Sequence, residues 1–206
     1  MKRLWILVAF LIGITGVSLA QQPKDQQMLG KPLPLADRPM LNVDGKQVTL
    51  GSLKGEKGLV LSFWSNTCPW VAKYEDRFLA LARTYQPKGF GFVVVNANDP
   101  EAHPREALEA MKKRALEKKY PFPYLVDENS ALARALGATR TPHVYVYDAS
   151  GKLVYVGAID DSPADPSKVE HPYLQEVLEA LLAGRSLPYT YTRAFGCTIK
   201  WYKPAE

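Results

Sequence analysis

Strand-like and helix-like hydrophobic patterns alternate along most of this chain. Two continuous apolar runs, GLVLSFW (58–64) and GFGFVVVNAND (89–99), predict central strands that are covered on both faces. Between them, apolar residues recur at spacings of three, four and seven, which predicts a helix that begins at Pro69. The later pattern predicts, in order, a helix over 104–119, a short strand over 122–127, a short helix over 129–138 and an amphipathic helix over 172–184.

Two segments have the alternating pattern of hairpins. MLNVDGKQVTL (40–50) places Asp44-Gly45 between two apolar runs, and this dipeptide suits a turn with positive φ. HVYVYDASGKLVYVGAID (143–160) has two alternating runs around a turn over 148–151. Strands that alternate with helices predict an α/β fold, and the later hairpin adds antiparallel strands to a parallel centre. We therefore expect one domain built on a mixed sheet, without internal repeats.

The first 20 residues have the features of a secretory signal peptide. Lys2 and Arg3 precede an unbroken apolar stretch, which ends in Ser18-Leu19-Ala20, a small-x-small cleavage site. The alternative is an N-terminal membrane anchor, because the apolar stretch 4–20 is just long enough to span a bilayer. We expect cleavage, export to the periplasm or the extracellular space, and no stable membrane association afterwards.

The rest of the chain divides into a polar, proline-rich linker (21–36), the α/β domain (37–186) and an aromatic-rich tail without a regular period (187–206). Loss of the signal lowers the formal net charge from +5 to +3, since only Lys2 and Arg3 are removed. The basic residues of the chain are mostly interleaved with acidic ones. A nucleic-acid-binding surface needs more concentrated positive charge, so we expect no such partner.

The chain has two cysteines, Cys68 and Cys197. In an oxidising compartment two cysteines form either a structural disulfide or a redox pair. Cys68 lies between the predicted strand 58–64 and the helix that begins at Pro69, where unpaired N–H groups and the helix dipole stabilise a thiolate. The position favours a nucleophile. The alternative is a cysteine that serves only as a small buried apolar residue.

Several motifs resemble those of the thioredoxin superfamily. LVLSFWSNTCPW is similar to its active-site approach, where a strand ending in Phe-Trp leads to the first cysteine of Cys-x-x-Cys, and TRTPHVYVYD resembles its cis-proline loop. DGKQVTLGSLKG resembles the extra N-terminal hairpin of the redoxin branch, which includes alkyl hydroperoxide reductase and thiol-specific antioxidant relatives. Over residues 30–203, an ordered set of motifs is similar to a peroxiredoxin-like group with a single cysteine at the first Cys-x-x-Cys position: NTCPW, NAND, YPFPYLVDE, LVYVGAIDDS and GCTIKW.

This resemblance implies a thioredoxin-like fold: a central mixed sheet flanked by helices, with an N-terminal hairpin and a C-terminal extension. It implies a thiol–disulfide oxidoreductase or a peroxiredoxin-like antioxidant enzyme, with Cys68 as the attacking cysteine and no cofactor. A cis Pro142, Thr141 and Trp70 would contact the substrate. The expected partners are a protein or small-molecule thiol or disulfide, or a peroxide, together with an external thiol reductant.

The chain also departs from the family patterns. Val71 occupies the position of the second Cys-x-x-Cys cysteine, and Ser62 replaces the buried acid of thioredoxins. A peroxidatic motif would have proline where this chain has Leu61, although Ser65 matches its hydroxyl residue. Cys68 also matches the first thioredoxin cysteine, whereas the peroxidatic cysteine of peroxiredoxins lies about one helical turn later. These differences disfavour the peroxiredoxin mechanism.

Three roles remain open for Cys197. It could resolve a mixed disulfide or a sulfenate on Cys68, form a structural disulfide worth roughly 5 kcal/mol in the chain-entropy model, or stay reduced under the tail aromatics. We therefore predict an exported thiol-dependent oxidoreductase, the alternative being a non-catalytic thioredoxin-fold binding module with inert or disulfide-locked cysteines.

No metal site is expected, because His103, His143 and His171 do not have metal-ligand spacing. His143 directly follows Pro142 and could tune Cys68; the alternative is that it only begins a strand. The adjacent acids Asp160 and Asp161 are expected to be solvated.

Overall fold

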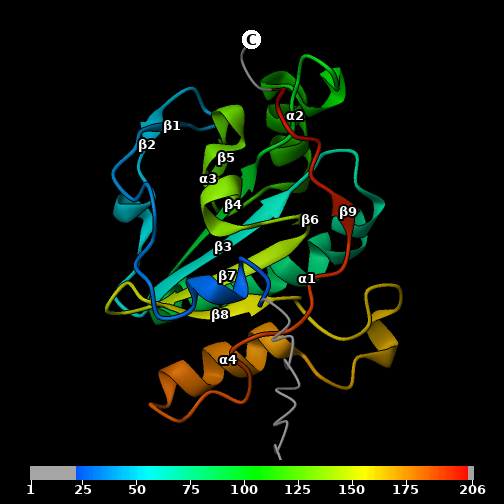
Figure 1. Cartoon of the computed structure of the whole chain (residues 1–206). Helices are drawn as coiled ribbons and strands as arrows, with labels where there is room; N and C mark the ends of the chain where they lie inside the picture. The colour runs from blue at the N-terminus through cyan, green and yellow to red at the C-terminus, as the bar shows by residue number, and fades with distance from the viewer. Residues whose placement is uncertain (1–21, 204–206) are drawn as a thin grey trace, which may run out of the picture.

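A five-stranded sheet forms the centre of the computed structural model, which describes residues 22–203 (Figure 1). Its order is β5-β4-β3-β7-β8. Strands β3, β4 and β5 are parallel, whereas β7 is antiparallel to both β3 and β8. This confirms the α/β fold with a mixed sheet. The strands are β3 (Gly58–Trp64), β4 (Phe90–Asn96), β5 (Tyr124–Val126), β7 (His143–Asp148) and β8 (Leu153–Gly157).

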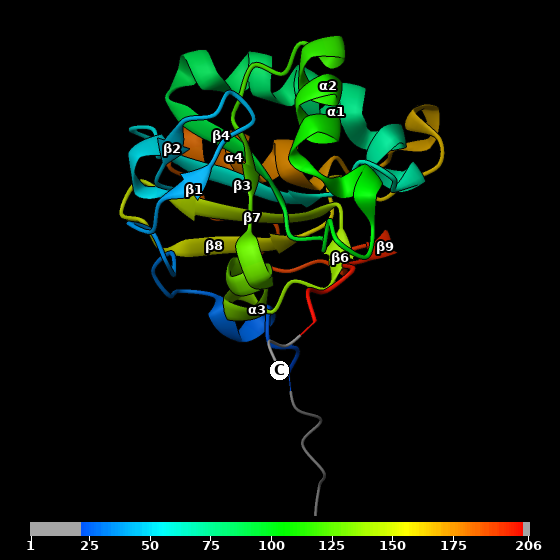
Figure 2. The ribbon, with the colours of Figure 1, turned by 90° about the horizontal axis from the view of Figure 1, so that it is seen from above.

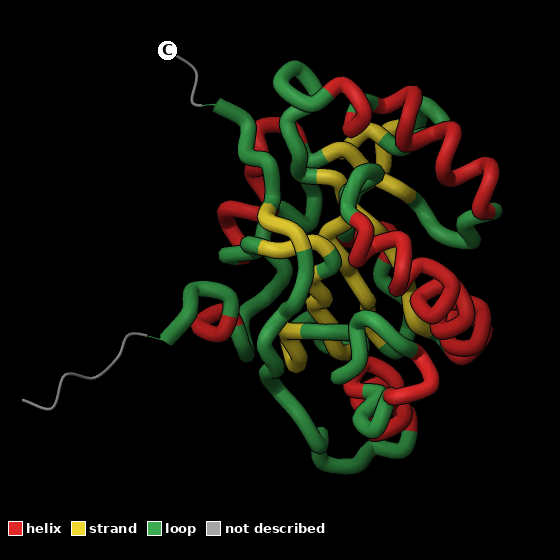
Figure 3. Tube along the Cα trace, turned by 90° about the vertical axis from the view of Figure 1, so that its right-hand side faces the viewer, coloured by secondary structure: helices red, strands yellow, loops and turns green. Residues whose placement is uncertain are grey.

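Helices cover both faces of the sheet (Figures 2 and 3). Side chains of α1 and α4 belong to one hydrophobic core and those of α3 to the other. Every residue of β3 is buried, because this strand lies between the two cores; this is the reason for its continuous apolar run. The helices are α1 (Pro69–Tyr85), α2 (Leu108–Lys118), α3 (Ala131–Leu136) and α4 (Tyr173–Leu182). Among the described residues, no helix combines the length and the apolar character needed to cross a bilayer.

The helix predicted over 104–119 is interrupted. A 3-10 turn, η4 (Pro104–Glu106), begins at Pro104 as expected, but Ala107 has an extended backbone (φ −65°, ψ 159°) and α2 begins only at Leu108. The interruption turns the side chain of Glu106 into the protein, where it is fully buried. The other 3-10 turns are η1 (Gln26–Met28), η2 (Gly51–Leu53), η3 (Gln86–Lys88), η5 (Glu128–Ser130) and η6 (Pro166–Lys168).

The N-terminal hairpin consists of β1 (Met40–Leu41) and β2 (Gln47–Val48), paired antiparallel. Gly45 in its turn has φ 85°, a conformation that glycine adopts easily, so the Asp-Gly prediction is confirmed. The segment 21–36, expected as a linker, includes η1 and a buried Asp25 within its described part. The signal peptide expected over 1–20 lies outside the described residues.

The C-terminal tail runs beside the edge strand β8. Thr190 and Thr192 both form backbone hydrogen bonds with Val156 of β8, each 3.0 Å long. The tail then forms β9 (Cys197–Thr198), which pairs antiparallel with β6 (Arg140–Thr141), so that Cys197 lies opposite Thr141. Figure 1 shows β9, in red, beside β6. The tail therefore reaches the loop that precedes β7, next to the start of α1.

Candidate functional site

Cys68 is the N-cap of α1, directly after the loop that follows β3. Its side chain is only 2% exposed, and its thiol donates a hydrogen bond to the carbonyl of Thr141 at 3.1 Å. The following Thr141–Pro142 peptide bond is cis, as the resemblance implied. The Cys68 sulfur therefore lies between the N-terminus of α1 and the cis-proline loop.

Cys197 provides the partner thiol. Its Sγ lies 2.6 Å from that of Cys68, and both cysteines are free. A disulfide has an S–S distance of about 2.05 Å, so a small movement would allow a bond. Burial, and secondly the contact with Cys68, raise the pKa of Cys197 to about 11, which makes it a protonated thiol at neutral pH. Val71, at the position of the second Cys-x-x-Cys cysteine, has no thiol. The tail supplies the second thiol of the site instead.

Contacts with other segments hold the tail on both sides of Cys197. On the C-terminal side, Ile199 is 2% exposed and its N–H donates to the carbonyl of Thr139. The backbone N–H of Lys200 donates to Asn98 Oδ1 at 2.9 Å. On the N-terminal side, the ring of Phe195 packs edge-on against Trp70, with 4.7 Å between the centroids. The position of Cys197 therefore results from several independent contacts.

Glu106 connects the tail to the loop before Cys68. Its carboxylate accepts hydrogen bonds from the hydroxyls of Ser65 and Thr67, both at 2.6 Å, and from the backbone N–H of Asn66 at 2.8 Å. It also forms a 2.8 Å ion pair with Nζ of Lys200, three residues after Cys197. One buried carboxylate thus holds both segments that carry the cysteines.

A second buried carboxylate supports the same loop from α1. Glu75 is 1% exposed and accepts a hydrogen bond from Nε of Arg114 at 2.8 Å and another from the hydroxyl of Tyr120. Arg114 in turn donates to the backbone carbonyl of Asn66 at 2.7 Å. The chain segment between β3 and Cys68 is therefore held from two directions.

Sequence patterns did not identify Glu106 or Lys200. An acidic residue in the first turn of a predicted helix, and a lysine in a tail without periodicity, both normally face solvent. Ser65 and Ser62, which the family patterns had singled out, have other partners: Ser65 binds Glu106, and Ser62 Oγ accepts a hydrogen bond from Nε1 of Trp64 at 3.1 Å.

The residues expected to contact substrate lie against the tail. Thr141 pairs with Cys197, and partly buried Trp70 packs on Phe195. The side chain of His143 lies elsewhere. Its Nε2 is 3.2 Å from Asp25 Oδ2, and its ring is 4.8 Å from that of Tyr145, in the core that contains α3. These contacts give His143 a structural role.

Asp160 was expected to be solvated, but it is buried in the structure. It is 4% exposed, its Oδ2 pairs with Nη1 of Arg77, and its Oδ1 accepts a hydrogen bond from Tyr74 at 3.2 Å. Its neighbour Asp161 comes together with Glu170 and His171 in a surface group of potential metal ligands. Two of its members have contacts within the protein: Asp161 Oδ1 accepts the backbone N–H of Glu170, and the Tyr189 hydroxyl lies 3.2 Å from Nδ1 of His171.

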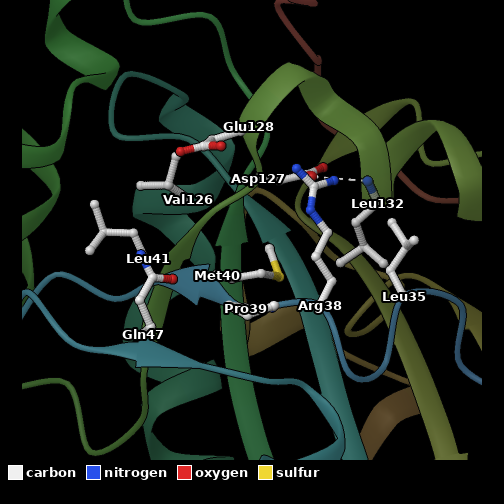
Figure 4. Close-up of a pocket in the computed structure, with 10 residues that line it drawn as sticks. All are labelled: Leu35, Arg38, Pro39, Met40, Leu41, Gln47, Val126, Asp127, Glu128 and Leu132. Carbon is white, nitrogen blue, oxygen red and sulfur yellow. Dashed lines mark hydrogen bonds between the residues drawn. The ribbon is translucent and has the colours of Figure 1, made fainter.

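A pocket of about 210 Å³ lies away from the cysteines, between the N-terminal hairpin and the start of α3 (Figure 4). Figure 4 shows the guanidinium of Arg38 directed toward Asp127. Asp127 accepts the N–H groups of Leu132 and Ala133, each at 2.9 Å, and therefore caps α3. The pocket has no nucleophile among its lining residues: Leu35, Arg38, Pro39, Met40, Leu41, Gln47, Val126, Asp127, Glu128 and Leu132. The cysteine pair remains the candidate site.

The structure predicts that Gly196→Ala displaces β9. An alanine Cβ at this position would overlap the carbonyl oxygen of Thr141, and backbone atoms cannot rotate away as a side chain can. We expect Cys68 of the reduced variant to react with iodoacetamide at least about tenfold faster than in the wild type. Peptide mapping of the alkylated protein measures this rate.

Thr198→Ala is the matched control for Gly196→Ala. It removes the hydroxyl that accepts a 2.7 Å hydrogen bond from Arg140, but keeps the β6–β9 backbone pairing. Its Cys68 should be as protected as in the wild type. An unchanged alkylation rate in Gly196→Ala would show that β9 does not cover Cys68.

The two buried glutamates predict that acid destabilises the protein. Burial acts to raise the pKa values of Glu106 and Glu75, but hydrogen bonds, led by those from Lys200 and Arg114 respectively, outweigh it, so both lie below the ordinary value of 4.5. As pH falls, these two carboxylates become protonated at a higher pH in the unfolded chain than in the folded protein. Their stabilisation is therefore complete above about pH 4.5 and is lost as pH falls through the lower native values.

Urea unfolding of the reduced protein at about pH 7 and about pH 3.5 measures this loss as a lower midpoint in acid. Glu106→Gln, which cannot titrate, should lose less stability between the two pH values than the wild type. Equal losses in both proteins would contradict the role given to Glu106.

The fold and the site together define a class of protein. A mixed sheet flanked by helices, with a cysteine at the start of α1 facing a cis-proline loop, is a thioredoxin-like fold. The sequence matches the Redoxin family over residues 28–172, and the chain belongs to that family. Cys197 lies outside the matched region.

Two solved structures are similar over most of their length. An uncharacterised conserved protein from Geobacillus kaustophilus is 41% identical, with a TM-score of 0.79, over 86% of this chain and 94% of that one. A hypothetical protein from Sinorhizobium meliloti 1021 is 34% identical, with a TM-score of 0.77, over 84% and 94%. Among curated proteins, the thiol-disulfide oxidoreductase ResA of Halalkalibacterium halodurans is 24% identical over 160 residues, which cover 75% of this chain and 86% of that protein.

Proposed function

We propose that this protein is a thiol–disulfide oxidoreductase whose redox pair is Cys68 and Cys197. The observation that carries the proposal is the 2.6 Å contact between two free thiols at the N-terminus of α1. The name of the curated relative, a thiol-disulfide oxidoreductase, supports the same reaction class.

In the proposed reaction, the Cys68 thiolate attacks one sulfur of a substrate disulfide. A mixed disulfide forms on Cys68, and the other substrate sulfur leaves as a thiolate. Cys197, after giving up its proton, attacks Cys68 Sγ; the Cys68–Cys197 bond forms and the second substrate thiolate leaves. The substrate gains two electrons and the cysteine pair loses two. An external thiol then reduces the pair, and no cofactor is required.

A disulfide fits this site better than a peroxide. The Ser65 hydroxyl, which matches that of a peroxidatic motif, donates its hydrogen bond to Glu106. We propose further that residues 1–20 direct the protein out of the cytoplasm, where its substrates would be cysteine-containing proteins or small thiols.

The test is the equilibrium of the pair with glutathione. We expect the purified protein to pass reversibly between dithiol and disulfide forms, with a reduction potential within the range of glutathione buffers, roughly −300 to −180 mV. Mass spectrometry after alkylation counts the free thiols. Two thiols that never oxidise, or a disulfide that glutathione cannot reduce, would instead support the non-catalytic binding module.

A further inference from the structure

The sulfur of Cys68 is enclosed when both thiols are reduced. Its side chain is 2% exposed, and its Sγ lies 3.1 Å from the carbonyl oxygen of Thr141 and 2.6 Å from Cys197 Sγ. The backbone of Gly196 lies against the same Thr141 carbonyl, because a Cβ on Gly196 would overlap its oxygen. Disulfide exchange requires direct contact between the attacking sulfur and a substrate sulfur. Part of this enclosure therefore has to move before Cys68 can attack.

The weakly held part of the enclosure is the segment 193–198, which we call the strap. None of its residues is buried, and among the described residues no backbone hydrogen bond joins 193–196 to the rest of the protein. Two hollows, of about 370 and 400 Å³, are each lined by Arg193 and Phe195, so open space lies beside the strap. Segments with few buried contacts and an exposed backbone open most easily. The strap is therefore the segment that we expect to move.

Both ends of the strap are fixed. Before it, Thr192 Oγ1 lies 2.7 Å from the Tyr155 hydroxyl and accepts the N–H of Ala158 at 3.0 Å. After it, Ile199 is buried, and Lys200 forms a 2.8 Å ion pair with a buried carboxylate. The strap can therefore lift as a loop between two anchors while the rest of the tail stays in place.

One side-chain contact holds the strap on the start of α1. The ring of Phe195 packs edge-on against Trp70, with 4.7 Å between the centroids, and Trp70 is the second residue of α1 after Cys68. Phe195 is nevertheless 47% exposed. An edge-on aromatic pair contributes a modest stabilisation, large enough to favour the closed strap and small enough for the strap to open.

We propose that the strap is autoinhibitory: it must lift from Cys68 before a substrate disulfide can react, and the contact of Phe195 with Trp70 is its latch. This rests on the proposed function, in which Cys68 is the nucleophile. With the strap lifted, the Cys68 thiolate forms a bond to one substrate sulfur, and the other sulfur leaves with the electron pair. Cys197 lies on the strap, so the return of the strap brings Cys197 Sγ to the mixed disulfide. Opening permits the attack, and closing permits the resolving step.

The test measures how fast Cys68 reacts in the reduced Cys197→Ser protein, where it is the only thiol. Two chromogenic disulfides are used, the anionic dithiobis(nitrobenzoic acid) and the neutral dithiodipyridine, and each attack releases one chromophore. Adding Phe195→Ala should raise both rates by the same factor, about three- to tenfold, because an open strap admits both reagents alike. Urea unfolding checks that the variant is folded.

Leu116→Ala is the matched control for Phe195→Ala. Leu116 is an exposed apolar residue of α2, outside the strap, and its replacement should leave both rates unchanged. Unequal factors for the two reagents, or slower reactions in Phe195→Ala, would mean that Phe195 contacts the reagent, and would overturn the inference. Unchanged rates would also overturn it. The proposed function fails on a different result, a wild-type cysteine pair that does not exchange with glutathione.

A second measurement tests the latch itself. Trp70→Ala removes the other ring of the contact, so in that background Phe195→Ala should change both rates by less than about twofold. An increase of about three- to tenfold that persists without Trp70 would show that Phe195 acts through another contact. The contact between the two rings would then not be the latch.

Discussion

Replacing Cys68 by serine is expected to lower disulfide-reducing turnover by about a thousandfold or more, to the level of the uncatalysed exchange. Serine has nearly the same size and can still donate to the Thr141 carbonyl, so the fold should be retained. A hydroxyl is not a nucleophile toward disulfides at neutral pH. The measurement is the glutathione-supported reduction of a protein disulfide, with thermal unfolding as the check on folding.

Cys197→Ser is the informative companion to this variant. It keeps the attacking sulfur but cannot resolve the first product, so one mixed disulfide per chain should accumulate on Cys68 and turnover should slow. If Cys68→Ser kept a tenth or more of the wild-type turnover, Cys68 would not be the nucleophile and the proposed mechanism would be wrong.

Replacing Glu106 by alanine is expected to lower the free energy of unfolding by about 3–5 kcal/mol, the range for breaking a buried ion pair. The hydroxyls of Ser65 and Thr67 and the N–H of Asn66 would lose their acceptor together, and Nζ of Lys200 its counter-ion. Urea unfolding of the reduced protein measures the loss.

Two variants separate the causes of that loss. Glu106→Gln keeps one acceptor oxygen without the charge, and we expect it to lose less than half as much stability. Glu109→Ala changes an exposed acidic residue in the first turn of α2 and should stay within about 0.5 kcal/mol of the wild type. A Glu106→Ala protein as stable as Glu109→Ala would mean that the carboxylate does not hold the two segments together.

Local patterns were sufficient for most of the fold. The continuous apolar run of β3, the period of α1 and the Asp-Gly turn each involve neighbouring residues, and each predicts a structure that is present. The position of Cys68 at the start of α1 followed from the same local information, because a buried strand, a cysteine and a proline succeed one another.

The second half of the site depends on contacts between distant residues. Cys197 and Cys68 are 129 residues apart, and β9 has only two residues, too few for a hydrophobic period. The side chain of Glu106 points inward because the helix is interrupted at Ala107. An alanine at this position does not predict an interruption, as a glycine or a proline would. Asp160 was misjudged for a similar reason, since its partner Arg77 lies on α1, far away in sequence.

The separation of the two cysteines also sets an order of events for a newly made chain. Strands β4, β5, β7 and β8 all lie between Cys68 and Cys197 in the sequence. A chain that emerges from the ribosome or through a membrane N-terminus first therefore presents Cys68 long before its partner. During that interval the Cys68 thiolate can attack the disulfides of other molecules, and the arrival of the tail both completes the pair and covers it.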